Sequence, residues 1–222
     1  MIKIAIDGPA GAGKSTVAKR LAKELSFQYV DTGAMYRGAA YLLNFYKLNL
    51  IDLVKLLERV TFDFLQENDS IKLIIEVDKK RFILDYELRT PEISELAGKL
   101  SKYKEIRELL VIKQKEVSNR RSSVIEGRDI ATVVSPDATL KIFLTASIEE
   151  RAKRRFCEWK NMGVNISLEE VMVSIKERDE IDKTRRYSPL TKVSDAIEID
   201  TTNLDVEMVI ERIKNIIKEC NL

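Results

Sequence analysis

The chain of 222 residues contains no histidine. This absence excludes a Ser-His-Asp triad, a Cys-His catalytic pair and every metal site that uses histidine ligands. Any chemistry must therefore depend on lysine, arginine, carboxylates and bound metal.

Cysteine and long apolar runs are also scarce. Cys157 and Cys220 are the only cysteines and lie far apart without CxxC spacing, so neither a disulfide framework nor a zinc site is expected. No apolar run approaches the ~18 residues that cross a bilayer, and the N-terminus lacks a signal-peptide pattern. We therefore expect a cytoplasmic protein without a membrane partner.

The chain also has no large excess of charge of either sign. Lysine and arginine number 38 against 36 for aspartate and glutamate, which gives a net charge of +2. This balance argues against a nucleic-acid partner, so a basic site must be a local cluster. The length and the hydrophobic content of 45% fit one soluble core, with room for small inserts.

The most informative feature present is the segment GPAGAGKST at residues 8–16. It satisfies the pattern G-x-x-x-x-G-K-[ST] between a predicted strand, Ile2–Ile6, and a predicted helix, Ser15–Leu25. Glycines permit backbone angles closed to other residues, so several N–H groups can converge on an anion at the helix N-terminus. We expect ATP to contact Gly8, Pro9, Ala10, Gly11, Ala12, Gly13, Lys14, Ser15 and Thr16.

Two side chains of this segment have expected roles in phosphoryl transfer. Lys14 would reach the β- and γ-phosphates, and the Ser15 hydroxyl would ligate Mg²⁺, the one expected cofactor. Transfer to a phosphate suits a chain without histidine, because a nucleoside monophosphate with a second pKa near ~6 is already a deprotonated nucleophile. Such an acceptor needs positioning and charge neutralisation rather than a general base.

Apolar runs between turn signals predict five core strands. Helical patterns follow most of them, as in Ile148–Trp159 and Val206–Lys218. This alternation predicts an α/β fold in which helices cover both faces of a parallel sheet, and ligands lie beyond the carboxyl ends of its strands. The predicted strands are Ile2–Ile6, Phe27–Val30, Ser123–Glu126, Leu140–Leu144 and Ala196–Ile199.

Polar residues follow two of these strands. Thr32 and Arg37 come after the second strand, and Arg128 comes after the third, directly behind Gly127. Taken alone, Thr32 fits a helix N-cap and Arg37 a solvated surface charge as well as a ligand site. The two segments therefore leave a structural and a functional interpretation open.

The helix predicted from Leu168 onward gives a stronger signal. Its apolar stripe includes Val171 and Ile175, and Arg178, Asp182 and Arg185 continue the same stripe within roughly 60° of one another. The face that packs on the core thus becomes charged without turning toward solvent. Structural ion pairs are one interpretation, and a cleft lined with arginine for an anionic ligand is the favoured one.

A further group of basic residues lies in the first turns of the helix that follows the fourth strand. This helix is followed by the predicted loop Lys160–Ile166, which contains Gly163. Arginines beside a closing loop would neutralise the transferring phosphoryl group and exclude water. An exposed helix face is the competing interpretation. The cluster comprises Arg151, Lys153, Arg154 and Arg155.

Residues 60–88 interrupt the alternation of strands and helices. Val60–Phe64, Ile71–Val77 and Phe82–Leu84 are strand-like, with turn signals at Asn68-Asp69 and Asp78-Lys79. This pattern predicts a small antiparallel insert. Two helices are expected after it, at Pro91–Leu100 and Lys104–Val117.

Across essentially its whole length the chain resembles the bacterial cytidylate kinases. The resemblance rests on GPAGAGKST at 8–16, DTGAMYR at 31–37, EGRDIATVV at 126–134 and IKERDEID at 175–182, together with shorter matches between them. It implies a single P-loop kinase domain, 1–222, of the nucleoside monophosphate kinase type. The implied parts are a core (1–32, 109–153 and 166–222), a monophosphate-binding insert (33–108) and a short lid (154–165).

The resemblance implies transfer of the γ-phosphoryl group of Mg-ATP to CMP or dCMP by a monomer. Arg37, Arg128 and Arg185 are similar to the clamp on the acceptor phosphate, and Arg178 and Asp182 to the ribose contacts. Arg107 and Asp129, with Thr32 nearby, match the residues that contact cytosine. The implied catalytic residues are Lys14, Arg128, Arg185, Arg154 and Arg155.

One departure from the family pattern concerns the base. A serine that contacts the base in relatives aligns with Gly98, so Ser94 or Ser101 would supply that contact here, or base discrimination would be softer. The preference among CMP, dCMP and UMP therefore stays open.

Two alternatives have distinct signatures. One is another small-molecule kinase acting on UMP, AMP or an alcohol, for which Asp129 is the candidate base. The other is a GTP-dependent switch, which would use an NKxD segment to recognise guanine. The nearest sequence, Thr191-Lys-Val-Ser-Asp195, has threonine in place of asparagine and fits poorly.

Overall fold

The computed structural model describes residues 1–67 and 70–220. The chain forms two compact units: a larger unit of residues 1–29 and 121–222, and a smaller unit of residues 30–120. The boundary between them falls within strand β2, Gln28–Asp31. None of the helices in the described part of the chain is long and apolar enough to cross a membrane.

The larger unit is built on a five-stranded sheet with the order β2-β6-β1-β7-β8. β1 pairs in parallel with β6 and β7, and β7 pairs in parallel with β8. Near-continuous burial of β1 and β6 fits a sheet covered on both faces. The strands are β1 (Lys3–Asp7), β6 (Ser123–Glu126), β7 (Leu140–Thr145) and β8 (Ile197–Asp200).

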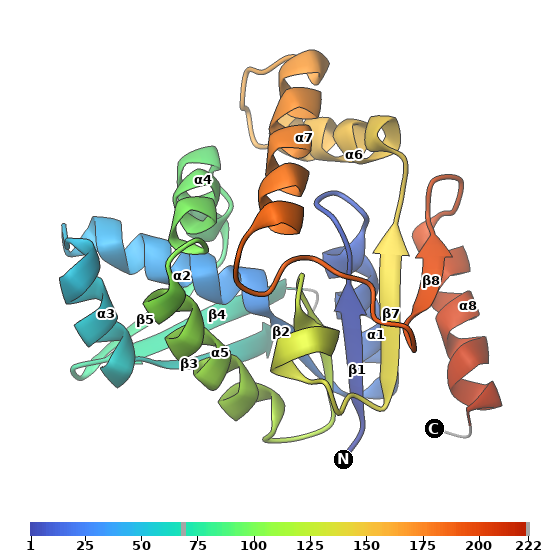
Figure 1. Ribbon diagram of the computed structural model, residues 1–222, viewed down its shortest axis with the longest axis horizontal. Helices are drawn as coiled ribbons and strands as arrows, with labels where there is room; N and C mark the ends of the chain where they lie inside the picture. The colour runs from blue at the N-terminus through green and yellow to red at the C-terminus, as the bar shows by residue number, and fades with distance from the viewer. Residues whose placement is uncertain (68–69, 221–222) are drawn as a thin grey trace. The chain divides into compact units, whose positions relative to one another are not determined.

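The helices of the larger unit follow its strands in the chain. α1 packs against β6 and α8, and α6 packs against α7 beyond the carboxyl end of β7 (Figure 1). The packing of α6 on α7 has its own apolar cluster, in which Trp159, Val171 and Ile175 are buried. These helices are α1 (Lys14–Leu25), α6 (Ile148–Asn161), α7 (Leu168–Thr184) and α8 (Val206–Glu219).

The register of the strands brings four chain segments to one edge of the sheet. Ile6 pairs with Glu126, Asp7 with Phe143, and Thr145 with Asp200, so the strands end level with one another. The segments that leave this edge begin at Gly8, Gly127, Ala146 and Thr201. A π-helical turn, Ile130–Val134, follows β6 and packs against β1.

The smaller unit contains an antiparallel sheet of β3 (Thr61–Glu67), β4 (Ser70–Val77) and β5 (Lys80–Leu84). α2 packs on β4 and α5 packs on β3. A 3₁₀ turn, Tyr86–Leu88, follows β5. The helices of this unit are α2 (Thr32–Phe45), α3 (Leu50–Arg59), α4 (Pro91–Leu100) and α5 (Lys104–Ser118).

The α/β prediction is confirmed, as is the antiparallel insert, and the ends of the five core strands differ from the predicted ones by at most one residue. Asp78 and Lys79 form the predicted turn, each with the left-handed φ that a tight two-residue hairpin needs. The turn predicted at Asn68-Asp69 lies outside the described residues.

The structure decides one open alternative and corrects one predicted boundary. Thr32 is the first residue of α2 rather than its N-cap, because Asp31 takes that position and accepts a hydrogen bond from the Ala34 N–H. The loop predicted at Lys160–Ile166 begins later, because α6 continues to Asn161 and closes in a turn at Gly163, which has φ +78°.

No residue range was predicted for α2, and α3 was not predicted at all, although α3 carries ordinary helix signals. Leu53, Leu56 and Leu57 are buried at helical spacing, and the Asn49 side chain caps the first turn.

Candidate active site

The glycine-rich loop has the backbone conformation expected of a phosphate-binding loop. Gly8, Gly11 and Gly13 all have positive φ. A Cβ on Gly8 would lie 2.0 Å from the carbonyl oxygen of Leu144, which is main chain and cannot move aside. Glycine at position 8 is therefore required both by conformation and by contact with β7.

The loop ends at the N-terminus of α1, where no side chain caps the first backbone N–H groups and a ligand can accept hydrogen bonds from them. Gly13 occupies the N-cap position without a side-chain cap, and the first turn of α1 carries no acidic residue. By contrast, Ser147 and Ser167 cap α6 and α7 through their hydroxyl groups. Uncapped N–H groups and the helix dipole together favour binding of an anion such as phosphate.

Lys14 lies inside this loop rather than in solvent. Its side chain is buried, and its ammonium group donates a 2.7 Å hydrogen bond to the carbonyl oxygen of Pro9. Burial, followed by the positive charge of Arg128, lowers the pKa of Lys14 to about 7. An anion bound beside Lys14 and Arg128 would relieve both effects.

Asp7 connects the start of the loop to the turn that follows β6. Its two carboxylate oxygens accept hydrogen bonds from the N–H groups of Ile130 and Ala131, at 2.9 and 2.8 Å. Burial raises the pKa of Asp7 to about 6, although these two hydrogen bonds lower it. Asp7 thus fixes the segment that carries Arg128 and Asp129.

Three arginines surround one buried carboxylate, that of Asp182. Arg128 Nε donates to Asp182 Oδ2 at 2.8 Å, Arg178 Nε donates to the same oxygen at 3.3 Å, and Arg185 Nη1 lies 3.6 Å from Oδ1. The Asp182 side chain is 0% exposed. The predicted charged continuation of the apolar stripe is confirmed for Arg178 and Asp182, whereas Arg185 lies one residue past the end of α7.

The charged groups of this cluster stabilise one another in their ionised forms. Burial alone would raise the pKa of Asp182, but Arg128, Arg178 and Arg185 together hold it below its usual range. Burial would lower the pKa of Arg128, and Asp182, Glu126 and Asp179 reverse this and raise it. Asp129 lies 3.8 Å from Arg185. Because three guanidinium groups share Asp182, ion pairing and an anion site are compatible here.

The basic residues of α6 have separate environments. Arg154 donates to both the hydroxyl and the carbonyl oxygen of Thr201, at 3.0 and 2.7 Å, and its Nη1 lies 3.5 Å from where a Cβ on Gly13 would stand. Arg155 pairs with Glu158 and lies over the Trp159 ring. Lys153 is exposed. The structure therefore brings Arg154, but not Arg155, next to the loop by a described contact.

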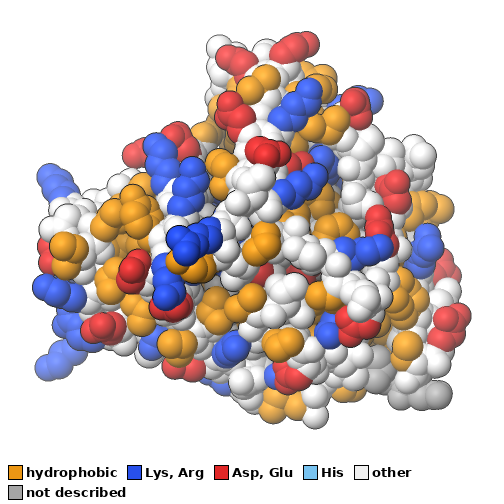
Figure 2. All heavy atoms as spheres, viewed as in Figure 1, with side chains coloured by type: hydrophobic (Ala, Val, Ile, Leu, Met, Phe, Trp, Pro, Cys, Tyr) orange, Lys and Arg blue, Asp and Glu red, His pale blue; other side chains and the backbone are white. Residues whose placement is uncertain are grey.

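Over α6 and α7, acidic and basic side chains are interspersed on the face that Figure 2 shows. Arg151, Asp179 and Asp182 are the charged residues of this helix pair that are buried.

In the smaller unit the predicted residues Thr32 and Arg37 lie near the start of α2, and Arg107 lies in the first turn of α5. Arg37 is half-buried and its Nη2 donates to Asp31 Oδ2 at 2.8 Å. Arg107 is buried, donates to the Ser101 carbonyl oxygen at 3.5 Å, and has its guanidinium 5.8 Å from the centre of the Tyr36 ring. Thr32 is also buried.

Ser94 and Ser101, the two serines near Gly98, differ in whether their hydroxyl groups are free to contact a ligand. The Ser101 hydroxyl is buried and donates to the Gly98 carbonyl oxygen at 2.7 Å, whereas Ser94 is half-buried on the same helix. Ser101 is therefore engaged within α4, which favours Ser94 as the serine that remains for a ligand.

The donor set fits a magnesium ion that the nucleotide itself helps to hold. Ser15 is exposed in the first turn of α1 and offers a hydroxyl oxygen, a hard ligand. Within residues 1–67 and 70–220 no cluster of three acidic, histidine or cysteine side chains could hold a metal alone. This combination matches Mg²⁺, which typically binds one or two protein oxygens together with substrate phosphates.

The sequence analysis missed two residues of this region and left the contacts of a third unpredicted. Asp7 and Thr201 each stand at the carboxyl end of a core strand, the position where ligand-contacting residues are expected. The Thr201 hydroxyl lies 3.2 Å from the carbonyl oxygen of Ala12 and 3.0 Å from that of Thr145, and its one proton can be donated to either, so it supports the loop. Arg151 was predicted only as part of a basic cluster, and its contacts have no signature in the sequence.

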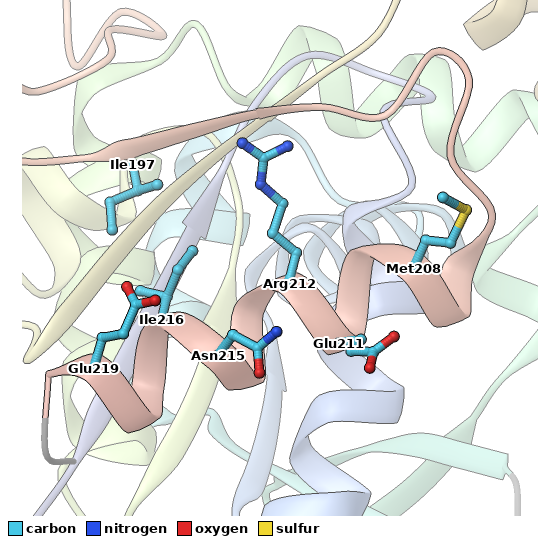
Figure 3. A pocket seen from close by; sticks show the side chains of 7 residues that line it. All are labelled: Ile197, Met208, Glu211, Arg212, Asn215, Ile216 and Glu219. Atoms are coloured by element: carbon cyan, nitrogen blue, oxygen red, sulfur yellow. The ribbon is translucent and has the colours of Figure 1, made fainter.

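Two features lie apart from these residues. Asp195, the last residue of the weak guanine-type segment, pairs with Lys141 at 2.7 Å on the surface. A shallow groove between β8 and α8, with Ile197 and Ile216 on its two sides, contains none of the residues described above (Figure 3).

Solved structures share the fold. A shikimate kinase from Bacteroides thetaiotaomicron matches with a TM-score of 0.51 and 14% identity, covering 98% of each chain. A protein from Eubacterium ventriosum matches with a TM-score of 0.52 and 17% identity, again over 98% of each chain. The fold and the glycine-rich loop together define a P-loop kinase fold.

Sequence comparison specifies the family. The family model described as cytidylate kinase matches residues 4–219. Proteins named cytidylate kinase are 44% identical in Alkaliphilus oremlandii, with 98% of both chains covered, and 47% identical in Caldanaerobacter subterraneus, with 98% of this chain and 95% of that protein covered. The chain belongs to the cytidylate kinase family.

Proposed function

We propose that the protein transfers the γ-phosphoryl group of Mg-ATP to CMP or dCMP, giving ADP and CDP or dCDP. The observation that carries the proposal lies within the larger unit. Lys14 is buried in a loop suited to phosphate, and the charge of Arg128 is near enough to lower the Lys14 pKa. Family membership supports the choice of cytidine monophosphate as acceptor.

In this proposal the loop amides and Lys14 hold the donor phosphates, and Ser15 holds the metal. The metal, when bound, neutralises charge on the phosphate oxygens. Arg128 and Arg185, which lie beside Asp182, are proposed to neutralise the acceptor phosphate together with Arg37, and Arg178 and Asp182 to contact the ribose. Arg107, Asp129 and Thr32 are proposed to contact the cytosine base, and Arg154 and Arg155 to act from the lid, residues 154–165.

The reaction needs no side chain as general base. The acceptor phosphate is largely dianionic at neutral pH, so the attacking oxygen already carries the electron pair. It attacks the γ-phosphorus in line, the bond to the β–γ bridging oxygen breaks, and ADP leaves with that electron pair. The arginines contribute by neutralising the charge that spreads over the transferred group.

The experiment that tests this function is an ADP-release assay with ATP and each nucleoside monophosphate in turn. We expect turnover that depends on CMP or dCMP and exceeds that with UMP, AMP or an alcohol acceptor. Ser94→Ala should raise KM for CMP if Ser94 supplies the contact that Gly98 lacks. Equal slow turnover with every acceptor would overturn the proposal and favour a GTP-dependent or ATP-dependent switch.

The proposal also includes a monomeric, cytoplasmic enzyme without nucleic-acid or membrane partners. Light scattering coupled to size-exclusion chromatography tests the first point, and a mass near 25.5 kDa is expected.

A further inference from the structure

Arg151 makes three contacts that join separate parts of the larger unit. Its side chain extends from the first turns of α6 and is only 8% exposed. Nε donates to the carbonyl oxygen of Ala146, at 3.0 Å. Nη1 donates to the carbonyl oxygen of Ala10 at 3.0 Å and to Asp179 Oδ2 at 2.6 Å. One guanidinium group thus connects the end of β7, the phosphate loop and α7.

The phosphate loop rests directly on this part of α6. Gly11 has φ +76°, and a Cβ there would lie 2.9 Å from both the Cβ and the carbonyl oxygen of Arg151. The loop therefore follows any displacement of Arg151, because it contacts both its side chain and its main chain.

Asp179 carries the connection onward to the arginine cluster. It lies on α7 beside Arg178 and one turn before Asp182. Its charge reaches Arg128, since it is one of the carboxylates that raise the pKa of that residue. Hydrogen bonds thus connect Ala10 to Arg151 and Arg151 to Asp179, and the electrostatic effect of Asp179 on Arg128 is the last link.

The free-energy cost of burying the Arg151–Asp179 ion pair indicates a role other than stabilising the fold. Asp179 Oδ1 is buried and accepts no hydrogen bond from the residues that the structure describes. A buried ion pair with an unsatisfied oxygen is often no more stabilising than apolar side chains of similar size. What the pair does provide is a fixed geometry between a loop carbonyl and one side of α7.

We infer that Arg151 and Asp179 are positioning residues that couple the donor site to the acceptor site. The inference rests on the proposed function, because it takes the phosphate loop as the ATP site and the α7 arginines as part of the CMP site. Neither residue contacts the substrates in this account. Their ion pair makes occupation of one site favour occupation of the other.

The test uses Arg151→Lys and Asp179→Asn in the full-length protein. Lysine keeps the charge but cannot reproduce the fork of a guanidinium, and asparagine keeps the shape but removes the charge. CMP affinity is measured by calorimetry with and without a saturating non-hydrolysable ATP analogue. We expect at least about a fivefold tightening in the natural protein and less than about twofold in each variant.

A cross-effect on kinetics separates coupling from local damage. Arg151→Lys should raise KM for CMP although Arg151 donates to the donor loop at Ala10 and to none of the residues proposed to bind CMP, and Asp179→Asn should raise KM for ATP although Asp179 lies on α7. Arg212→Lys, at an exposed position of α8, and Glu180→Gln, the exposed neighbour of Asp179, are matched controls and should leave both constants unchanged.

A double replacement distinguishes coupling from stability. Arg151→Met combined with Asp179→Leu should recover much of the stability lost in the single variants while the coupling stays absent. Recovery of coupling by this apolar pair would overturn the inference, as would an effect of each single variant on one substrate only, or no coupling in the natural protein. Failure of the natural protein to phosphorylate CMP would instead overturn the proposed function.

Discussion

The ammonium group of Lys14 donates its hydrogen bond to the carbonyl oxygen of Pro9, five residues earlier in the loop that it helps to form. Lysine normally keeps its charge well above neutral pH, but here burial and Arg128 lower its pKa to about 7. The protonation state of Lys14 therefore changes within the physiological pH range, so ATP binding should be accompanied by a measurable uptake of protons.

ATP binding at pH 8 is expected to take up a proton at Lys14. The free side chain is mostly neutral at that pH, and phosphate oxygens favour the charged form, so the bound state holds more protons. ATP affinity should therefore fall as the pH rises above about 7, by at most about tenfold per pH unit from this group.

Calorimetry in two buffers with different ionisation enthalpies measures this uptake. Lys14→Arg is the control, because its side chain is charged throughout and takes up no proton. Equal uptake in the natural protein and in this variant would contradict the assignment of the shifted pKa to Lys14.

Lys14→Ala should reduce kcat by about 10³-fold, because it removes a charge that stabilises the transferring phosphoryl group. CMP affinity should remain close to that of the natural protein, since the acceptor is held by arginines. Steady-state kinetics and direct CMP titration check the two statements separately, and near-normal turnover would exclude the assigned role.

Asp182→Asn should lower the free energy of unfolding by about 3 kcal/mol, because it leaves three partly buried arginines without the buried carboxylate that they share. Asp195→Asn breaks a surface pair with Lys141 and should cost less than about 1 kcal/mol. Urea unfolding at neutral pH compares the two. Equal effects would mean that the three arginines do not depend on Asp182.

Gly8→Ala should abolish ATP binding, because the new methyl group would overlap the main chain of Leu144. Gly163→Ala is the comparison: its φ is also positive, but nothing lies within 4 Å of the added atom. That variant should bind ATP and lose only about 1 kcal/mol of stability through backbone strain. Thermal unfolding with and without ATP separates the two outcomes.

The sequence predicted those parts of the site that depend on local pattern. The spacing of Gly8, Gly13 and Lys14 needs only a strand before and a helix after, and both are present. The charged stripe of α7 follows from helical periodicity alone, so Arg178 and Asp182 were placed on the buried face.

Contacts between distant segments could not be predicted. The partner of Arg151 is 28 residues away, and nothing in the sequence distinguishes it from the exposed Lys153 nearby. The N-cap of α2 could not be decided for a related reason: Asp31 and Thr32 both have side chains suited to that position, and only the backbone conformation decides between them.

The most direct test of the central claim follows the fate of the γ-phosphoryl group. ATP labelled at the γ-phosphate is incubated with the protein, Mg²⁺ and CMP, and the products are separated. The account predicts that the label appears in CDP, that its appearance requires CMP, and that little is released as inorganic phosphate. Label released as inorganic phosphate at the same rate with and without CMP would contradict it.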